Sequence, residues 1–135
     1  MKMLKRIATA GVTIGLAVAV ALPASAATAD GSFTATCDPA NYGFATNGTA
    51  YQHSTYGTIS VKQTASSPQV TSSVKVTSQN GNSTPVVNVS DGATAKWTGV
   101  LTGQYKVYAR SSSGVNCNGA WPGNGNYTFS YTITY

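Results

Sequence analysis

The last nine residues of the chain constrain its fold most, because large and small side chains alternate there without a break. The odd-numbered positions from Tyr127 to Tyr135 are aromatic or aliphatic, and the even-numbered positions between them are Thr or Ser. A period of two places successive side chains on opposite faces of a β-strand. The segment therefore predicts a strand whose face with Phe129 and Ile133 packs into a core, while its hydroxyl face meets water.

Shorter runs rich in Val, Thr and Tyr recur along the chain and are separated by turn residues. Asn80-Gly81 and Asp91-Gly92, for example, are turn dipeptides that accept a positive φ. Further strands are predicted at residues 33–37, 57–64, 70–78, 86–89, 95–100 and 104–110. A spacing of roughly 8–12 residues between turns is typical of antiparallel sandwiches. We expect an all-β fold, a small antiparallel β-sandwich of six or seven strands, of the immunoglobulin-like or prealbumin-like kind.

The composition also favours strands over helices. There is no Glu anywhere in the chain, and Leu101 is the only leucine after residue 22. Helical domains draw on Leu, Glu and Lys, whereas Thr, Val and Tyr favour strands and Gly, Asn and Ser favour turns. No helix is expected after residue 26.

One segment resembles a known structural repeat. Trp97-Thr-Gly-Val-Leu-Thr-Gly-Gln-Tyr-Lys-Val107 is similar to the strand–turn–strand of prealbumin-like and collagen-adhesin B-type repeats, which often read aromatic-x-x-(Leu/Val)-x-x-Gly-x-Tyr-x-Val. The resemblance covers about ten residues and is shared by many sandwiches, so it implies a fold and not a function.

Residues 1–26 have the pattern of a secretory signal peptide. Lys2, Lys5 and Arg6 precede an uncharged run, and Ala24-Ser25-Ala26 provides the small residues of a cleavage site. The alternative is an uncleaved membrane anchor, but the run of 16 residues between Arg6 and Pro23 is shorter than the ~20 that span a bilayer. We expect cleavage, a single secreted domain at residues 27–135, an extracellular location, and no membrane insertion after cleavage.

Removal of the leader changes the charge of the chain. The remaining chain has five basic residues and three aspartates, which gives a formal charge of +2. The whole chain has a formal charge of +5. The basic residues are scattered singly, whereas nucleic-acid binding needs a clustered basic face. A nucleic-acid partner is therefore not expected.

The two cysteines are predicted to pair. In a secreted chain an even number of cysteines indicates a disulfide, here Cys37–Cys117, which would close a loop of about 80 residues and add ~4.5 kcal/mol in the chain-entropy model. Free thiols or an intermolecular bridge are the alternatives. A metal site is not expected, because His53 is the only histidine and no CxxC motif is present.

The side chains that carry out catalysis are scarce. The only carboxylates are those of Asp30, Asp38 and Asp91, and no GxSxG motif accompanies the single histidine. His53 is expected at an exposed or edge position. We therefore expect no enzymatic activity, no catalytic residues and no cofactor.

Two segments, 38–55 and 111–126, do not follow the strand pattern, and the predicted disulfide would bring them together. Long irregular segments are often functional. Tyr, Ser, Gly and Asn, which dominate adaptable binding surfaces, are abundant after residue 26. Tyr108 is predicted to be exposed on the face of its strand that carries Lys106 and Arg110, whereas Trp97, Tyr105, Tyr127 and Tyr131 are predicted in the core. The candidate binding residues are Tyr42, Phe44, Tyr51, His53, Tyr108 and Trp121.

These features predict a small secreted, non-catalytic binding or adaptor module that contacts another secreted or cell-surface protein. It could be a structural subunit of an extracellular assembly such as a secreted toxin particle; small adaptors of umbrella-type toxin particles are similar in size and export. An unpaired arm at residues 27–36 or an edge strand would allow strand addition by the partner. A stand-alone antibacterial or inhibitor polypeptide and a module that binds carbohydrate or cell wall, with glycan as ligand, are the alternatives.

Overall fold

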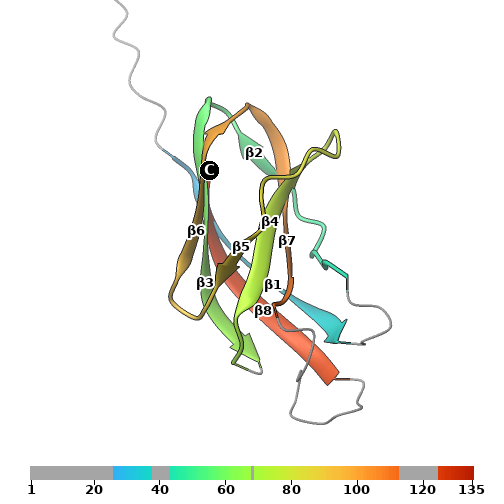
Figure 1. Ribbon diagram of the computed structural model, residues 1–135. Helices are drawn as coiled ribbons and strands as arrows, with labels where there is room; N and C mark the ends of the chain where they lie inside the picture. Colours follow the sequence, from blue (N-terminus) through green and yellow to red (C-terminus); the bar gives the residue numbers. More distant parts are fainter. Residues whose placement is uncertain (1–25, 38–42, 68, 113–124) are drawn as a thin grey trace, which may run out of the picture.

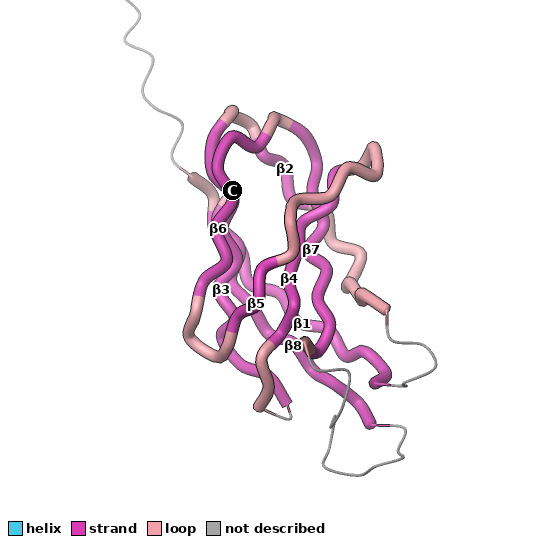
Figure 2. The backbone as a smooth tube through the Cα atoms, in the orientation of Figure 1, coloured by secondary structure: helices cyan, strands magenta, loops and turns pink. Residues whose placement is uncertain are grey.

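The computed structural model describes residues 26–37, 43–67, 69–112 and 125–135 (Figure 1). Within these ranges the chain forms β-strands and no helix, and hence no helix long and apolar enough to cross a membrane (Figure 2). The strands are β1 (Thr28–Cys37), β2 (Tyr51–His53), β3 (Gly57–Ser67), β4 (Ser72–Ser78), β5 (Val87–Val89), β6 (Thr94–Val100), β7 (Gly103–Ser111) and β8 (Gly125–Thr134).

The strands form two antiparallel sheets of four strands each, in the orders β1-β8-β3-β6 and β2-β7-β4-β5. Every connection between these strands except β4–β5 passes from one sheet to the other. The segment resembling a strand–turn–strand repeat does form two successive strands, but β6 pairs with β3 while β7 pairs with β2 and β4. The all-β, antiparallel prediction is confirmed, and the arrangement is sandwich-like.

The predicted number of strands was too low, because the described residues alone form eight. The additional strand, β2, lies inside segment 38–55, where no strand was expected, and three residues are too few to show a period of two. The first strand begins at Thr28 rather than Phe33, because its small polar first half gives no apolar signal and is held by pairing with β8. Residues 27–36 are therefore not an unpaired arm.

The inner faces of the two sheets share one core. Side chains with no solvent exposure come from both sheets, among them Val61 on β3, Val76 on β4 and Val107 on β7. In β8 the alternation predicted from the sequence is confirmed, since Phe129 and Ile133 are also fully buried. The predicted burial of four aromatic side chains is confirmed as well: Trp97, Tyr105, Tyr127 and Tyr131.

A buried polar cluster joins two turns at one end of the core. The Gln63 amide is completely buried, and its Nε2 donates to Asp91 Oδ1 (2.6 Å) and to the Val70 carbonyl (3.1 Å). The Ser66 hydroxyl donates to the same carboxylate oxygen at 3.0 Å. The pairing of β3 with β8 shifts register between Gln63 and Ala65, which is typical of a β-bulge. These bonds tie the β3–β4 connection to the β5–β6 turn.

The Tyr131 hydroxyl lies in a second buried cluster. It shares a hydrogen bond of 2.9 Å with the Tyr51 hydroxyl, and Asn47 Nδ2 donates to it at 3.2 Å. Burial, and after it the hydrogen bond to Tyr51, raises the pKa of Tyr131 above the ordinary tyrosine value of about 10. The folded state therefore holds this phenol in its neutral form.

The protein is expected to lose stability as the pH rises above about 10, where Tyr131 ionises in the unfolded chain but not in the folded one. Because the folded-state pKa is the raised one, this contribution is complete below pH ~10 and falls by up to about 1.4 kcal/mol per pH unit above it. Urea unfolding between about pH 9 and pH 11.5 measures the slope. Tyr131→Phe should flatten it, and Tyr56→Phe, at a side chain that is 69% exposed, should leave it unchanged. An unchanged slope in Tyr131→Phe would contradict this assignment.

Candidate functional site

Two of the candidate binding residues belong to the core. Tyr51 and His53 are 5% and 2% exposed, because β2 pairs with β7 and its alternate side chains face inward. β2 is an edge strand, as expected for His53, but the imidazole itself is not exposed. Neither ring nitrogen of His53 has a hydrogen-bond partner in the part of the chain that the structure describes, and the ring lies edge-on to Tyr105 at 6.2 Å between centroids. Neither side chain contributes to a surface.

Four predicted site residues cannot be placed. Tyr42, Cys117 and Trp121 lie outside the described residues, as does the side chain of Cys37. The Cys37–Cys117 disulfide and the meeting of segments 38–55 and 111–126 stay predictions. Among the described residues no group of three or more His, Cys, Asp or Glu could hold a metal ion.

The two remaining candidates, Phe44 and Tyr108, meet on the outer face of the β2-β7-β4-β5 sheet. Lys75 lies opposite Tyr108 in the β4–β7 register, with its Nζ 5.9 Å from that ring centroid and 4.6 Å from the centroid of Phe44. Arg110 Cζ lies 4.5 Å from the Phe44 centroid. The backbone of Ala45 bonds to that of its bridge partner on β7, which fixes Phe44 beside the sheet. Cations within ~6 Å of an aromatic ring centroid are attracted to its face.

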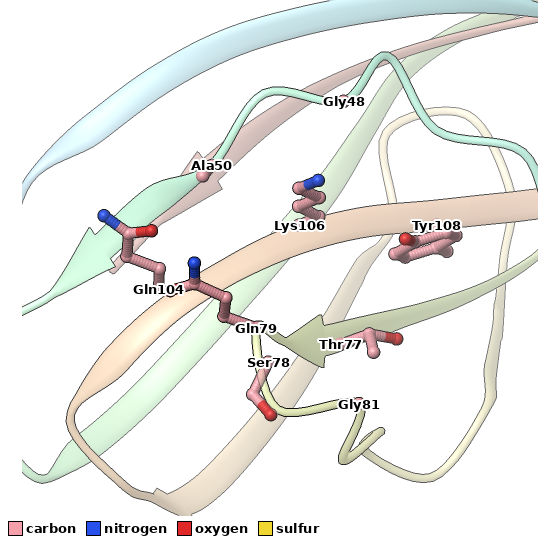
Figure 3. Close-up of a pocket in the computed structure, with 9 residues that line it drawn as sticks. All are labelled: Gly48, Ala50, Thr77, Ser78, Gln79, Gly81, Gln104, Lys106 and Tyr108. Carbon is pink, nitrogen blue, oxygen red and sulfur yellow. The ribbon is translucent and has the colours of Figure 1, made fainter.

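A pocket of about 450 Å³ adjoins this cluster on the same face (Figure 3). Its floor is formed by outward side chains of β4 and β7, which the alternation of each strand directs away from the core. The segment with Gly48 and Ala50 forms one wall, and the turn with Gly81 forms the other. The lining residues are Gly48, Ala50, Thr77, Ser78, Gln79, Gly81, Gln104, Lys106 and Tyr108.

The wall at Gly48 is braced by short-range hydrogen bonds. The Gly48 N–H donates to Thr46 Oγ1 at 3.1 Å and the Thr49 N–H donates to Asn47 Oδ1 at 3.0 Å, while Gly48 adopts a φ of 79°. Asn47 also donates to the buried Tyr131 hydroxyl. The wall is therefore attached to the core by hydrogen bonds within the chain.

This outer face is the positively charged part of the described molecule. Three of the five basic residues after residue 26 lie on it, namely Lys75, Lys106 and Arg110. The two aspartates whose positions are described are placed elsewhere: Asp30 accepts a hydrogen bond from Thr132, and Asp91 belongs to the buried Gln63 cluster. Sequence alternation had placed Lys106, Tyr108 and Arg110 on one face, which the structure confirms, although Tyr108 is only partly exposed.

A second, more open pocket of about 520 Å³ lies where β5 and β6 flank the core. Trp97, Val100 and Leu101 line it, and the Trp97 Nε1–H donates to the Pro85 carbonyl at 2.8 Å. Leu101 is 68% exposed. This pocket is more apolar than the first, although polar side chains also line it, namely Asn82, Ser83, Thr84, Lys96 and Thr98.

The third surface feature is the edge of β1, which ends the β1-β8-β3-β6 sheet and is unpaired among the described residues. Ala27 and Tyr135 exchange both backbone hydrogen bonds at 2.8 Å, and the antiparallel register continues to the end of β1. Bonded and non-bonded pairs alternate in such a ladder. The N–H and C=O groups of residues 28, 30, 32, 34 and 36 therefore point away from β8, toward the edge.

No protein-family model and no curated protein matches the chain in sequence.

Proposed function

We propose that this chain is a small secreted, non-catalytic binding module that joins another secreted or cell-surface protein by strand addition at β1. The observation that supports this most is the length of the β1 edge: ten residues, against three each in β2 and β5. Main-chain hydrogen bonds give a partner strand its affinity, and pockets for alternate side chains give it specificity.

The chemistry of β1 also favours pairing. Edge strands are usually protected from pairing with other chains by Lys or Pro residues, by β-bulges or by their short length. β1 contains no Lys, Arg or Pro, its single charged side chain, Asp30, accepts a hydrogen bond from Thr132, and its register with β8 is continuous. The edge strand of comparable length, β6, carries Lys96 and a positive φ at Gly99. A partner strand would therefore meet the fewest obstacles at β1.

The other parts of the proposal follow from the sequence. Residues 1–26 act as a cleaved leader, Cys37 and Cys117 pair in the oxidising exterior, and residues 27–135 form a sandwich of the immunoglobulin-like or prealbumin-like kind. Such a module would serve as a structural subunit of an extracellular assembly, with a toxin particle as one instance.

The variant Ser32→Pro tests whether a partner strand pairs with the edge of β1. The Ser32 N–H points away from β8, so Ser32→Pro removes an outward donor and leaves the β1–β8 hydrogen bonds in place. The preceding Gly31 has no Cβ to clash with the proline ring. We expect the wild type to retain a protein partner from culture supernatant of the producing cells and Ser32→Pro to lose it.

Ser32→Ala is the matched control, because it removes the hydroxyl that contacts Ser130 but keeps the backbone donor. It should retain the partner, and circular dichroism should show that both variants fold. Equal retention by Ser32→Pro would contradict strand addition at β1. Growth inhibition by the purified protein without any partner would instead support a stand-alone antibacterial polypeptide.

A further inference from the structure

We propose that the pocket on the outer face of the β2-β7-β4-β5 sheet binds a saccharide that carries an anionic group. This site lies on the sheet that does not contain β1, and it is independent of the proposed strand addition. Its volume of about 450 Å³ falls within the roughly 300–1,000 Å³ typical of small-ligand sites.

Two carboxamides supply the hydroxyl recognition. The Gln79 N–H donates to the Gln104 carbonyl at 3.0 Å, so the two side chains leave neighbouring points of the backbone. Figure 3 shows both amide groups on the side of the pocket near Ala50. Each carboxamide offers donors and an acceptor together, which matches adjacent hydroxyl groups that also donate and accept. A purely apolar ligand would leave these groups without partners.

Lys106 supplies the charge. It lies between Gln104 and Tyr108 along β7, and its side chain extends toward the wall that carries Gly48 (Figure 3). No carboxylate of the described residues lines the pocket. Lys75 and Arg110 lie further along the same face and add to its positive potential. An anionic substituent on the ligand would therefore be attracted to the Lys106 ammonium.

Tyr108 supplies a flat surface for the ring of the sugar. It is partly exposed at the end of the pocket next to Lys75, whose Nζ lies 5.9 Å from the ring centroid. Tyrosine adds contact area at a low cost in conformational entropy. The braced Gly48 wall requires little ordering when a ligand enters. Two amides, an ammonium and an aromatic ring around one pocket match the hydroxyl groups, the anionic group and the ring of an acidic sugar.

Isothermal titration of the full secreted chain at low salt tests the site. We expect binding of trigalacturonate, as the carboxylate probe, or of glucose 6-phosphate, as the phosphate probe, at least ten times tighter than binding of neutral maltotriose. Lys106→Gln should weaken that binding about tenfold or more, because a charge-assisted hydrogen bond is lost. Lys62→Gln removes the same charge from an exposed position on β3 and should leave the affinity unchanged.

Three results would overturn the proposal. If maltotriose bound as tightly as the anionic probes, the anionic group would play no part in recognition. If Lys106→Gln bound the probes as tightly as the wild type does, the ligand would bind outside this pocket. Inorganic phosphate that binds as tightly as either anionic probe would show that no saccharide is recognised. Because Ser32→Pro alters the other sheet, it should bind the probes as the wild type does, so the two proposals can fail separately.

Discussion

Phe129→Ala is expected to lower the free energy of unfolding by about 3–5 kcal/mol, a large part of the ~5–15 kcal/mol typical of a small protein. Phe129 is fully buried on β8, the strand that pairs with both β1 and β3. Its ring centroid lies 5.5 Å from that of Phe33 and 5.4 Å from that of Tyr131. Truncation leaves a cavity that these rings cannot close. Urea unfolding followed by circular dichroism measures the loss.

Tyr56→Ala is the control for this change, because it deletes an aromatic ring that is 69% exposed. It should change the free energy of unfolding by less than about 0.5 kcal/mol. A loss below about 1 kcal/mol in Phe129→Ala would show that the interior of this sheet is not packed as described.

Gly31→Ala is expected to cost about 2–3 kcal/mol, although it adds only one methyl group. Gly31 lies opposite Tyr131 in the β1–β8 register, and the Tyr131 ring lies over it. A Cβ at position 31 would overlap Tyr131 Cζ and its hydroxyl, and would stand 2.8 Å from Cε1. Because that hydroxyl bonds to Tyr51 and Asn47, displacing the ring would also break these bonds. The melting temperature and the urea midpoint report the loss.

Gly57→Ala should have the opposite effect on the free energy of unfolding. An added Cβ at Gly57 meets nothing within 4 Å, so the variant should gain a few tenths to 1 kcal/mol from reduced freedom of the unfolded chain. In a Tyr131→Leu background the cost of Gly31→Ala should fall by more than half, because the overlapping ring is gone. An undiminished cost there would place the strain at the backbone instead of at the ring.

The strands with a clear period of two were predictable from the sequence. In β8 and β7 the inward positions are large or apolar and the outward positions are polar, so both the strand and its buried face follow from the residue types. The same alternation placed Lys106, Tyr108 and Arg110 on one face, and Lys106 and Tyr108 line the candidate pocket.

Polar residues in the interior could not be predicted in this way. Glutamine usually lies at the surface and histidine is intermediate, yet Gln63 and His53 are both buried, because their strands pair in a register that turns them inward. For Gln63 the burial depends on Asp91, which is distant in sequence and accepts its hydrogen bond. No local pattern contains that partner.

The pocket as a whole depends on contacts between distant segments. Gln79 and Gln104 become neighbours only because β4 and β7 pair, and the Gly48 wall is held by Asn47 through the Tyr131 hydroxyl on the other sheet. Tyr51 and His53 lie in the same irregular segment as Phe44, and its residue pattern does not indicate which of the three side chains turn inward.

The alternation of residue types along each strand was enough to predict an antiparallel β fold and the buried faces of the strongest strands. The tertiary structure alone decided which strands are neighbours, that β1 ends a sheet with a long free edge, and that cationic, amide and aromatic groups converge on one outer face. The physical reason is that strand order and register arise from pairing between distant segments, whereas periodicity describes only the strand in which it occurs.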